Sequence, residues 1–344
     1  MAFLRKSFKW AGITIPSFLI IFLGYYHKEV AYGISQGIAQ IRIIKNARPV
    51  SELMHDPSVP DSVKQKILLI SDIKKFAVDS LGITPSESYT SYYDQQGKPI
   101  LWVVTACPAY KLEPYEWRFP IAGGFTYKGF FDYEKAVGEE NRLKKLGYDT
   151  NIEEVSAWST LGWFNDPILS SMLKRKPGSL ANLIIHEMTH GTLYVRDDVR
   201  FNENLASFVG DKGAIRFLKY KYGENSSELE EYRTSHQARK VFRMKVLELS
   251  SKLSSLYESF TDETREEEKY NQKQVLISEI KDSLLNYLPG GKNTEELAKV
   301  NNTFFMDYIR YHSQEEEFES EFSSRYSGDL KKYINYLKDK YPSL

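Results

Sequence analysis

The stretch His186-Glu187-Met188-Thr189-His190 puts two imidazoles and a carboxylate within about one turn of a predicted helix. Side chains four positions apart on a helix project from the same face, so His186 and His190 can bind one metal ion. Glu187 lies beside them, where it can act as a general base towards a water molecule. This H-E-x-x-H spacing is typical of zinc-dependent peptidases; the alternative is an amphipathic helix with two incidental histidines.

The residues before the motif predict that it lies on a packed helix. The stretch Pro177-Gly178-Ser179 breaks the preceding segment, and Ser179 is a suitable N-cap for the helix that follows. Leu180, Leu183 and Ile184 then form an apolar side that would hold the helix in a core.

A catalytic zinc ion needs a third protein ligand and leaves the fourth position to water. A histidine six residues after His190 would complete one pattern, but that position is Arg196. Glu203 is the favoured candidate, because the residues three and seven positions after it are Ala206 and Gly210, and such a small face lets two helices pack closely. Alternatively, Glu203 is only a carboxylate favoured near a helix N-terminus. The other acidic residues downstream are Asp197, Asp198 and Asp211, of which the first two are expected in a loop as caps or solvated charges.

The stretch from Leu180 to Gly213 resembles the bacterial predicted-aminopeptidase family, which comprises membrane-associated zinc metallopeptidases of the gluzincin type. Further blocks carry the same resemblance along nearly the whole chain after residue 28: FPIAGG at 119–124 with YKGFFD at 127–132, STLGWFNDP at 159–167, and Asn301-Asn302 followed by Tyr311-His312. The chain departs from the family at Gly124, where a cysteine is frequent, and in lacking a lipid-attachment cysteine.

The resemblance implies that His186, His190 and Glu203 bind Zn²⁺ and that Glu187 is the general base for hydrolysis of a peptide substrate. It also implies aminopeptidase activity. The oxyanion that develops during such a reaction needs a further donor. Tyr311 and His312 are the candidates for this catalytic role, because they stand together in a resembling block.

Tyr127 is a third candidate for the oxyanion donor, and an ordinary packed or surface position is the alternative for all three residues. An aminopeptidase also pairs the free ammonium of its substrate with a carboxylate. Asp132, Glu134 and Asp166 are guesses for that role.

The expected fold class is α+β: a zincin-like metallopeptidase domain at residues 29–344, mostly helical, with a small mixed sheet and a long antiparallel helical hairpin. Hydrophobic periodicity predicts helices at 29–47, 61–81 and 132–146 and strands at 99–106, 119–127 and 149–158. Extended substrates commonly bind along a strand edge, and the backbone around Gly123-Gly124 or Thr160-Leu161-Gly162 could provide it.

A heptad-like seam predicts the hairpin at about 226–288. Phe242, Val246, Leu249, Leu253, Leu256 and Phe260 alternate spacings of four and three, and Ile277, Ile280, Leu284 and Tyr287 continue the pattern after a turn-like segment. The hairpin is expected to be a packed arm of the domain. An arm that binds an unknown protein partner or gates the substrate is the alternative.

Residues 1–28 are expected to form a single-pass signal anchor. Arg5, Lys6 and Lys9 precede an uncharged stretch from Trp10 to Tyr26, which is close to the shortest length that spans a bilayer. The positive charges predict a cytoplasmic N-terminus, and hence a catalytic domain on the periplasmic side of a bacterial inner membrane. A cleaved signal peptide and a buried helix are the alternatives.

Composition argues against nucleic acid as a partner. Lys plus Arg and Asp plus Glu both number 46, and no basic stripe with interleaved aromatic residues is present. The single cysteine, Cys107, follows an apolar run and is expected to be a buried, inert thiol. The competing function is a non-catalytic, membrane-tethered binding or scaffold protein whose metal site is structural or lost. Glu187 argues against it, because a structural metal site needs no base beside its ligands.

Overall fold

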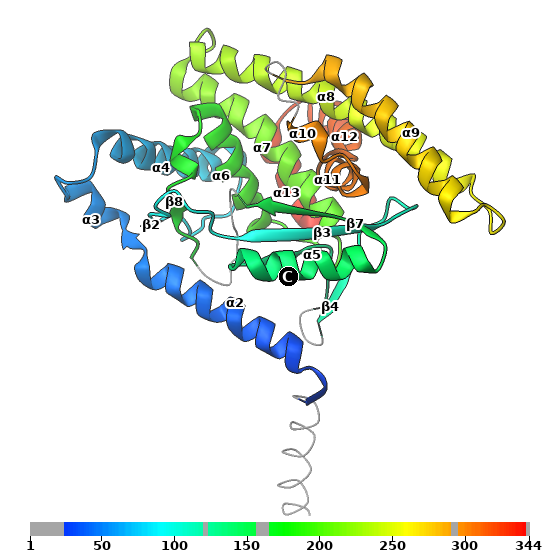
Figure 1. The fold of residues 1–344 in the computed structure, drawn as a ribbon. Helices are drawn as coiled ribbons and strands as arrows, with labels where there is room; N and C mark the ends of the chain where they lie inside the picture. Colours follow the sequence, from blue (N-terminus) through cyan, green and yellow to red (C-terminus); the bar gives the residue numbers. More distant parts are fainter. Residues whose placement is uncertain (1–23, 120–122, 156–164, 290–294, 342–344) are drawn as a thin grey trace, which may run out of the picture.

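The computed structural model describes residues 24–119, 123–155, 165–289 and 295–341. Helices dominate, and the strands form three small sheets, which confirms the expected mostly helical α+β class (Figure 1). The helices are α2 (His27–Asn46), α3 (Val50–His55), α4 (Asp61–Leu81), α5 (Tyr133–Lys145), α6 (Pro177–His190), α7 (Val199–Tyr222), α8 (Ser227–Glu258), α9 (Glu266–Leu284), α10 (Glu295–Ala298), α11 (Asn302–His312), α12 (Glu315–Tyr326) and α13 (Leu330–Lys340), with short 3₁₀ turns η1 (Met172–Lys174) and η2 (Leu285–Tyr287).

The sheets are small and differ in strand direction. β1 (Arg48–Pro49) pairs antiparallel with β2 (Ser91–Tyr93), which pairs parallel with β8 (Ile168–Leu169). β3 (Trp102–Pro108) is the centre of an antiparallel sheet, between β6 (Lys128–Phe130) and β7 (Tyr148–Glu154). β4 (Trp117–Phe119) and β5 (Gly123–Phe125) form a separate hairpin. The strand expected at 119–127 is therefore divided, because residue 119 ends β4, residues 123–125 form β5, and the two strands pair antiparallel.

The largest apolar cluster surrounds α6 and α7. Helix α4 contributes its predicted apolar side, and Ile67, Ile70, Ile73 and Ala77 are fully buried there. Helices α12 and α13 close the cluster from another side through Phe318, Phe322 and Tyr333. These neighbours fix the two helices that carry the metal-binding motif.

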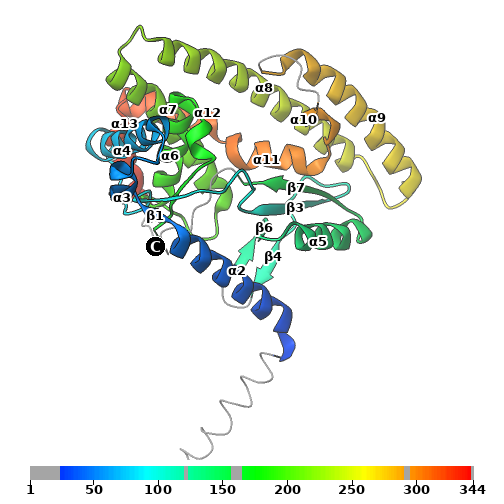
Figure 2. The ribbon, with the colours of Figure 1, turned by 60° about the vertical axis from the view of Figure 1, so that its left-hand side comes forward.

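The predicted helical hairpin corresponds to α8 and α9, which run as a long pair on the opposite side of the molecule from α2 (Figures 1 and 2). Its seam residues Phe242, Val246, Leu249, Leu253, Ile277, Ile280 and Leu284 are buried in a second cluster together with Phe305 of α11. The seam thus packs against the rest of the chain as well as within the hairpin.

The small antiparallel sheet is covered by α5, and together they form a third cluster around Val104, Phe130 and Leu143. Asp132 is the N-cap of α5, with its side chain accepting a hydrogen bond from the backbone N–H of Glu134. On β3, Cys107 is fully buried, and burial raises the pKa of its thiol to about 12. An inert thiol was the expectation for this residue.

The N-terminal end of α6 differs from the expectation. Ser179 is not the N-cap of α6, because the helix starts at Pro177, whose fixed φ suits the first helical position, and Lys176 is the cap.

Most of the uncharged stretch from Trp10 to Tyr26 lies outside the described residues. Within the described residues, no helix combines the length and apolar character needed to cross a membrane.

Candidate metal centre

Helix α6 places both histidines of the motif near its C-terminal end. Ile184, Ile185 and Met188 bury the opposite side of the helix in the core. His190 is the last helical residue and is buried, whereas His186 is partly exposed. Packing of the apolar side therefore points the imidazoles away from the core and towards α7.

Helix α7 approaches α6 closely because the residues between them are small. A Cβ atom at Gly213 would lie 2.9 Å from side-chain atoms of Ile185 and 3.0 Å from Leu81, so only glycine fits there without a shift. Ala206 and Gly210 are also buried in this interface. The small face predicted after Glu203 is therefore the face that contacts α6.

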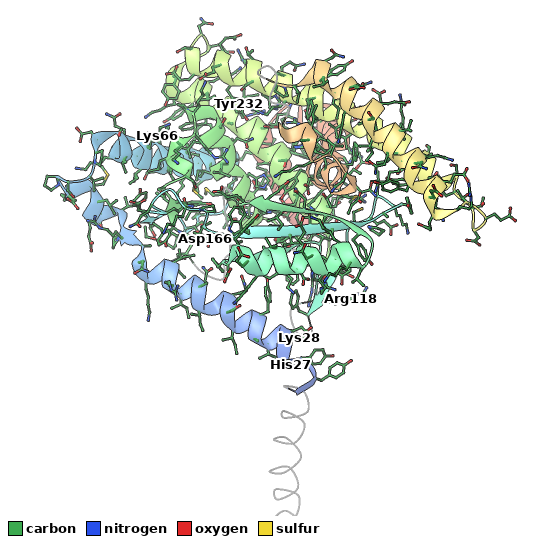
Figure 3. The ribbon with its side chains drawn as sticks, viewed as in Figure 1. His27, Lys28, Lys66, Arg118, Asp166 and Tyr232 are labelled. Carbon is green, nitrogen blue, oxygen red and sulfur yellow. The ribbon has the colours of Figure 1, made fainter. Side chains whose placement is uncertain are left out.

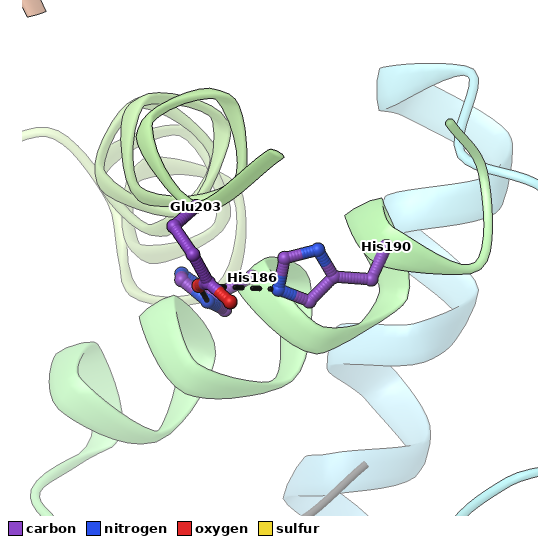
Figure 4. A group of neighbouring side chains, drawn as sticks. All are labelled: His186, His190 and Glu203. Carbon is purple, nitrogen blue, oxygen red and sulfur yellow. Dashed lines mark ion pairs between the residues drawn. The ribbon is translucent and has the colours of Figure 1, made fainter. Parts of the chain in front are cut away.

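Glu203 projects from α7 between the two histidines (Figure 4). Its Oε2 atom lies 3.3 Å from Nε2 of His186 and 3.5 Å from Nε2 of His190. In the part of the chain that the structure describes, these residues are the one group of three His, Cys, Asp or Glu side chains whose donor atoms converge, all within 4.8 Å of one another. Three residues from two helices thus meet at one point.

The donor atoms fit a metal ion. At metal–donor distances of about 2.1 Å, neighbouring corners of a tetrahedron are about 3.4 Å apart, which matches both measured separations. Two imidazole nitrogens and one carboxylate oxygen also form a donor set that occurs at catalytic zinc sites with an open fourth position. His190 Nδ1 has no hydrogen-bond partner among the described residues and faces away from this point.

The charges of the three side chains are coupled. Burial alone would raise the pKa of Glu203, but hydrogen bonds from His186 and His190 outweigh it and hold this pKa well below its usual range. Burial would lower the pKa of His190, and the contact with Glu203 raises it overall. An ionised carboxylate at this position is the form that binds a cation.

Several tyrosines surround the centre. The ring of Tyr311, on α11, lies 6.4 Å from the ring of His186, and Tyr194 lies 6.3 Å from His190. Burial raises the pKa of Tyr127 to about 12, with the charges of Glu203 and Glu187 raising it further. Tyr127 lies between β5 and β6 and is 37% exposed overall. The raised pKa keeps its hydroxyl protonated, as a hydrogen-bond donor requires.

Glu187 is partly buried on the same turn as the histidines. Its charge, after burial itself, helps to raise the pKa of Tyr89 well above the usual value. Tyr89 has a φ of 66°, which bulky residues rarely adopt, and its N–H donates to the backbone oxygen of Asp166 at 2.6 Å. The charge of the general-base candidate thus acts on the phenols of Tyr89 and Tyr127.

A cavity of about 1500 Å³ shares Tyr311 with the surroundings of His186, although His186, Glu187, His190 and Glu203 do not line it. Tyr311 and His312 line it from α11, and residues of β7 and α8 line its other sides, including Asn151, Glu153, Arg239, Phe242 and Arg243. Burial lowers the pKa of His312 to about 3, and the positive charge of Arg243 lowers it further, so its imidazole is neutral. The sequence candidates Tyr311 and His312 therefore both line the cavity, and the ring of Tyr311 also lies near that of His186.

Asp211, the remaining acidic alternative to Glu203, belongs to a different network. Its Oδ1 accepts hydrogen bonds from Asn182 at 2.8 Å and Tyr232 at 3.1 Å, and its Oδ2 lies 2.9 Å from His236. Asp198 caps α7 by accepting from the N–H of Phe201. Neither carboxylate converges on the histidines, as expected for Asp198.

Sequence reasoning overlooked Tyr194 and Tyr89. Tyr194 follows His190 by four positions, a helical spacing that could have drawn attention to it, although α6 ends before it. Tyr89 lies far from the motif and carries no sequence signal.

Thr160-Leu161-Gly162, one of the proposed strand edges, lies outside the described residues. Gly123 and Gly124 are in β5, which pairs with β4.

Comparison with known proteins gives a match at the level of a family. A family model described as "Putative aminopeptidase" matches residues 31–340, a range that includes α6, α7 and the residues that line the cavity. No curated protein and no solved structure shows a significant match to the chain.

Proposed function

The chain belongs to the family described as "Putative aminopeptidase", and from this premise we propose that it is a zinc-dependent peptidase that removes residues from the amino ends of peptides. One observation carries the proposal: Glu203 of α7 converges on His186 and His190 of α6, with Glu187 on the same turn. A metal-binding group and a carboxylate base are the minimum that hydrolysis of this kind requires.

Zinc is the proposed metal because the donor set contains two imidazoles and one carboxylate. Bound there, it would polarise a peptide carbonyl and lower the pKa of a coordinated water. His186, His190 and Glu203 would hold it. The close packing of α6 on α7 would hold these side chains in position for the metal.

Glu187 is proposed as the general base. A carboxylate beside the metal ligands can accept a proton from the attacking water and deliver it to the leaving amine. Its surroundings contain the phenols of Tyr89 and Tyr127, which can donate hydrogen bonds to a carboxylate but do not neutralise it. A purely structural metal site would have no use for this residue.

Tyr311 is the preferred donor to the developing oxyanion, with Tyr127 as the second candidate. Both phenols have raised pKa values, first because of burial and then because of the charge of Glu203, so both keep their protons in the working pH range. The ring of Tyr311 is packed near His186. His312 lines the cavity together with Tyr311 and is proposed to contact the peptide as a neutral imidazole.

The amino-terminal preference requires a carboxylate in the cavity, and Asp307 is proposed for it. Asp307 and Tyr311 are four positions apart on α11, so they share a face about 6 Å apart along the helix axis. The Asp307 side chain lines the cavity and is 3.3 Å from Arg310. Burial raises its pKa to about 7, Arg310 opposes this rise, and Glu153 adds to it.

An ammonium group in the cavity would add a second positive charge beside Asp307, because the ion pair with Arg310 does not outweigh the effect of burial on its pKa. Of the three residues guessed from the sequence, Asp132 serves as the cap of α5, Glu134 is exposed beside it, and Asp166 is buried next to Tyr89. Asp307 is preferred to these because it stands in the cavity wall on the same helix face as Tyr311.

The membrane location remains a proposal from the sequence. An N-terminal anchor within residues 1–28 would hold the protein in a bacterial inner membrane, with the metal centre on the periplasmic side. The charges at Arg5, Lys6 and Lys9 before the uncharged stretch support this orientation.

The proposal is tested with Glu187→Gln in the full chain, purified in detergent and loaded with zinc. Turnover of peptides should fall by about 10²–10⁴-fold, because the general base is lost, while one zinc per chain is retained. Peptide hydrolysis and elemental analysis of the same preparation measure the two quantities. Glu134→Gln, at an exposed position, is the matched control and should keep both.

Turnover in Glu187→Gln equal to that of the wild type would exclude the mechanism. Zinc binding by the wild type without hydrolysis of any peptide in a mixed peptide library would favour the scaffold alternative. Equal rates on free and N-acetylated peptides would retain the peptidase and reject its amino-terminal preference.

A further inference from the structure

Helix α2 leaves three isoleucines exposed on its outer side while its inward side buries a polar residue next to Ile43. Its inward side carries Gln40, which is only 6% exposed. The Nε2 atom of that amide has no hydrogen-bond partner among the described residues. Buried amides normally find partners, and surface helices normally bury their isoleucines. The arrangement therefore indicates that the outer side of α2 faces something other than water.

The outer side of α2 is an isoleucine stripe: Ile34, Ile38 and Ile41, which are 58%, 56% and 47% exposed. Spacings of four and three residues place them on one face. Tyr25, just before the helix, is 77% exposed. A set of large apolar side chains in a row differs from the scattered apolar residues found on ordinary surfaces.

The charges next to the isoleucine stripe fit an anionic surface. After Glu29 in its first turn, α2 contains two cations, Arg42 and Lys45, and no further acidic residue. Both cations are exposed. Basic residues beside an apolar helix face suit phospholipid head groups of negative charge, and tyrosine is frequent at the same depth of a bilayer.

The position of α2 in the chain selects the lipid surface over a second protein. The helix follows directly on the uncharged stretch from Trp10 to Tyr26, whose composition is that of a membrane segment. His27 and Lys28 stand at its outer end, away from the body of the molecule (Figure 3). The helix itself carries too many charges to cross a bilayer, which leaves the interface as the place where its stripe can be covered.

We propose that α2 lies on the surface of an anionic phospholipid membrane with Ile34, Ile38 and Ile41 inserted among the lipids. The helix then holds the domain against the bilayer by a contact separate from any anchor in the preceding residues. This proposal does not depend on the peptidase activity.

Site-specific fluorescence tests the contact in the full chain, reconstituted into vesicles of phosphatidylethanolamine and phosphatidylglycerol. Cys107 is fully buried, so a thiol-reactive NBD label reports on an introduced cysteine, with the unsubstituted chain as the blank. Ile38→Cys carries the label in one sample. Val275→Cys, on the distant α9 and 60% exposed, carries it in the control.

The label at position 38 should show blue-shifted emission in vesicles and quenching by doxyl groups on the lipid chains, and it should be protected from iodide in the water. The label at position 275 should show the reverse. Equal iodide quenching at the two positions would overturn the proposal, as would failure of the chain to associate with vesicles. A blue shift without doxyl quenching, accompanied by cross-linking between labelled chains, would overturn it in favour of a second copy.

Discussion

Gly210 of α7 lies directly against His186 of α6. A Cβ atom at position 210 would be 3.3 Å from the Cβ of His186 and 3.0 Å from the backbone oxygen of Asn182. The missing side chain therefore sets how closely the helix that carries Glu203 approaches the helix that carries both histidines. The distance between α6 and α7 therefore determines how close the Glu203 carboxylate comes to the two imidazoles.

Gly210→Ala should weaken both the fold and the metal site. The added methyl group meets the backbone of α6, which cannot move like a flexible side chain, and overpacking of this kind costs about 1–3 kcal/mol. Thermal unfolding and zinc titration measure the two effects. Gly138→Ala in α5 is the matched control, because nothing lies within 4 Å of its Cβ position, and it should stabilise by roughly 0.5–1 kcal/mol. Equal effects of the two substitutions would contradict the packing argument.

Glu203→Gln should remove most of the metal affinity. An amide keeps the shape of the side chain but loses the charge that holds a cation between His186 and His190. Substitution of outer-shell partners costs about 10–100-fold in affinity, so loss of a direct ligand should cost more than about 100-fold. Competition with a chelator measures it. Zinc retention at the wild-type affinity would show that another residue is the third ligand.

Tyr311→Phe and Tyr127→Phe distinguish the two oxyanion donors. Removal of one oxyanion donor typically lowers kcat by about 10²–10³-fold, and the residue that donates in the transition state should show this loss with little change in KM. Steady-state kinetics at saturating zinc measure it. We expect the larger loss for Tyr311. The opposite ranking would transfer the role to Tyr127, and unchanged kcat in both would exclude phenols from this function.

Asp307 should make amino-terminal recognition dependent on pH. Burial raises its pKa to about 7, so the carboxyl group takes up a proton as the pH falls below that value and can no longer balance an ammonium group. KM for free peptides should therefore rise towards acidic pH, whereas KM for N-acetylated peptides should not. Asp307→Asn should raise KM for free peptides at all pH values and abolish this dependence. Identical pH profiles for both substrates would refute the assignment.

The same substitution should stabilise the protein at alkaline pH. A carboxyl group whose pKa rises from 3.8 to about 7 on folding favours the folded state less once the pH exceeds the lower value, because the ionised form is better solvated in the unfolded chain. Arg310 and Glu153 are the charges next to it. The melting temperature of Asp307→Asn should exceed that of the wild type at about pH 8 and converge with it at about pH 4. A lower melting temperature at alkaline pH would contradict this.

The sequence predicted the parts of the site that local spacing determines. His186 and His190 share a helix face because four positions separate them, and Glu203 was favoured because Ala206 and Gly210 follow it at helical spacing. The buried side of α4 and the seam of the hairpin were also predictable from periodicity. Each of these signals lies within one continuous segment.

The remaining parts depend on contacts between distant segments. Asp307 gave no signal, because its position in the cavity wall follows from how α11 packs against α8 and β7. Tyr89 is far from Glu187 in the sequence, and a backbone hydrogen bond to Asp166 helps to hold it in the core. The prediction of Ser179 as the N-cap of α6 was wrong, because the helix already begins at Pro177, a residue that suits the first helical position. Such features are set by tertiary structure, and periodicity carries no information about them.

The hydroxyl of Tyr32 in α2 donates a hydrogen bond to the backbone oxygen of Gly129 at 2.8 Å, and its ring stacks on Phe119. Gly129 lies only two positions after Tyr127. A truncation meant to free the peptidase from its N-terminal region should therefore begin no later than His27. A shortened chain that starts at Ala47 would lack Tyr32 and therefore its contacts with Gly129 and Phe119, which hold the segment that carries Tyr127. A loss of activity in that shortened chain would then not be evidence against the metal site.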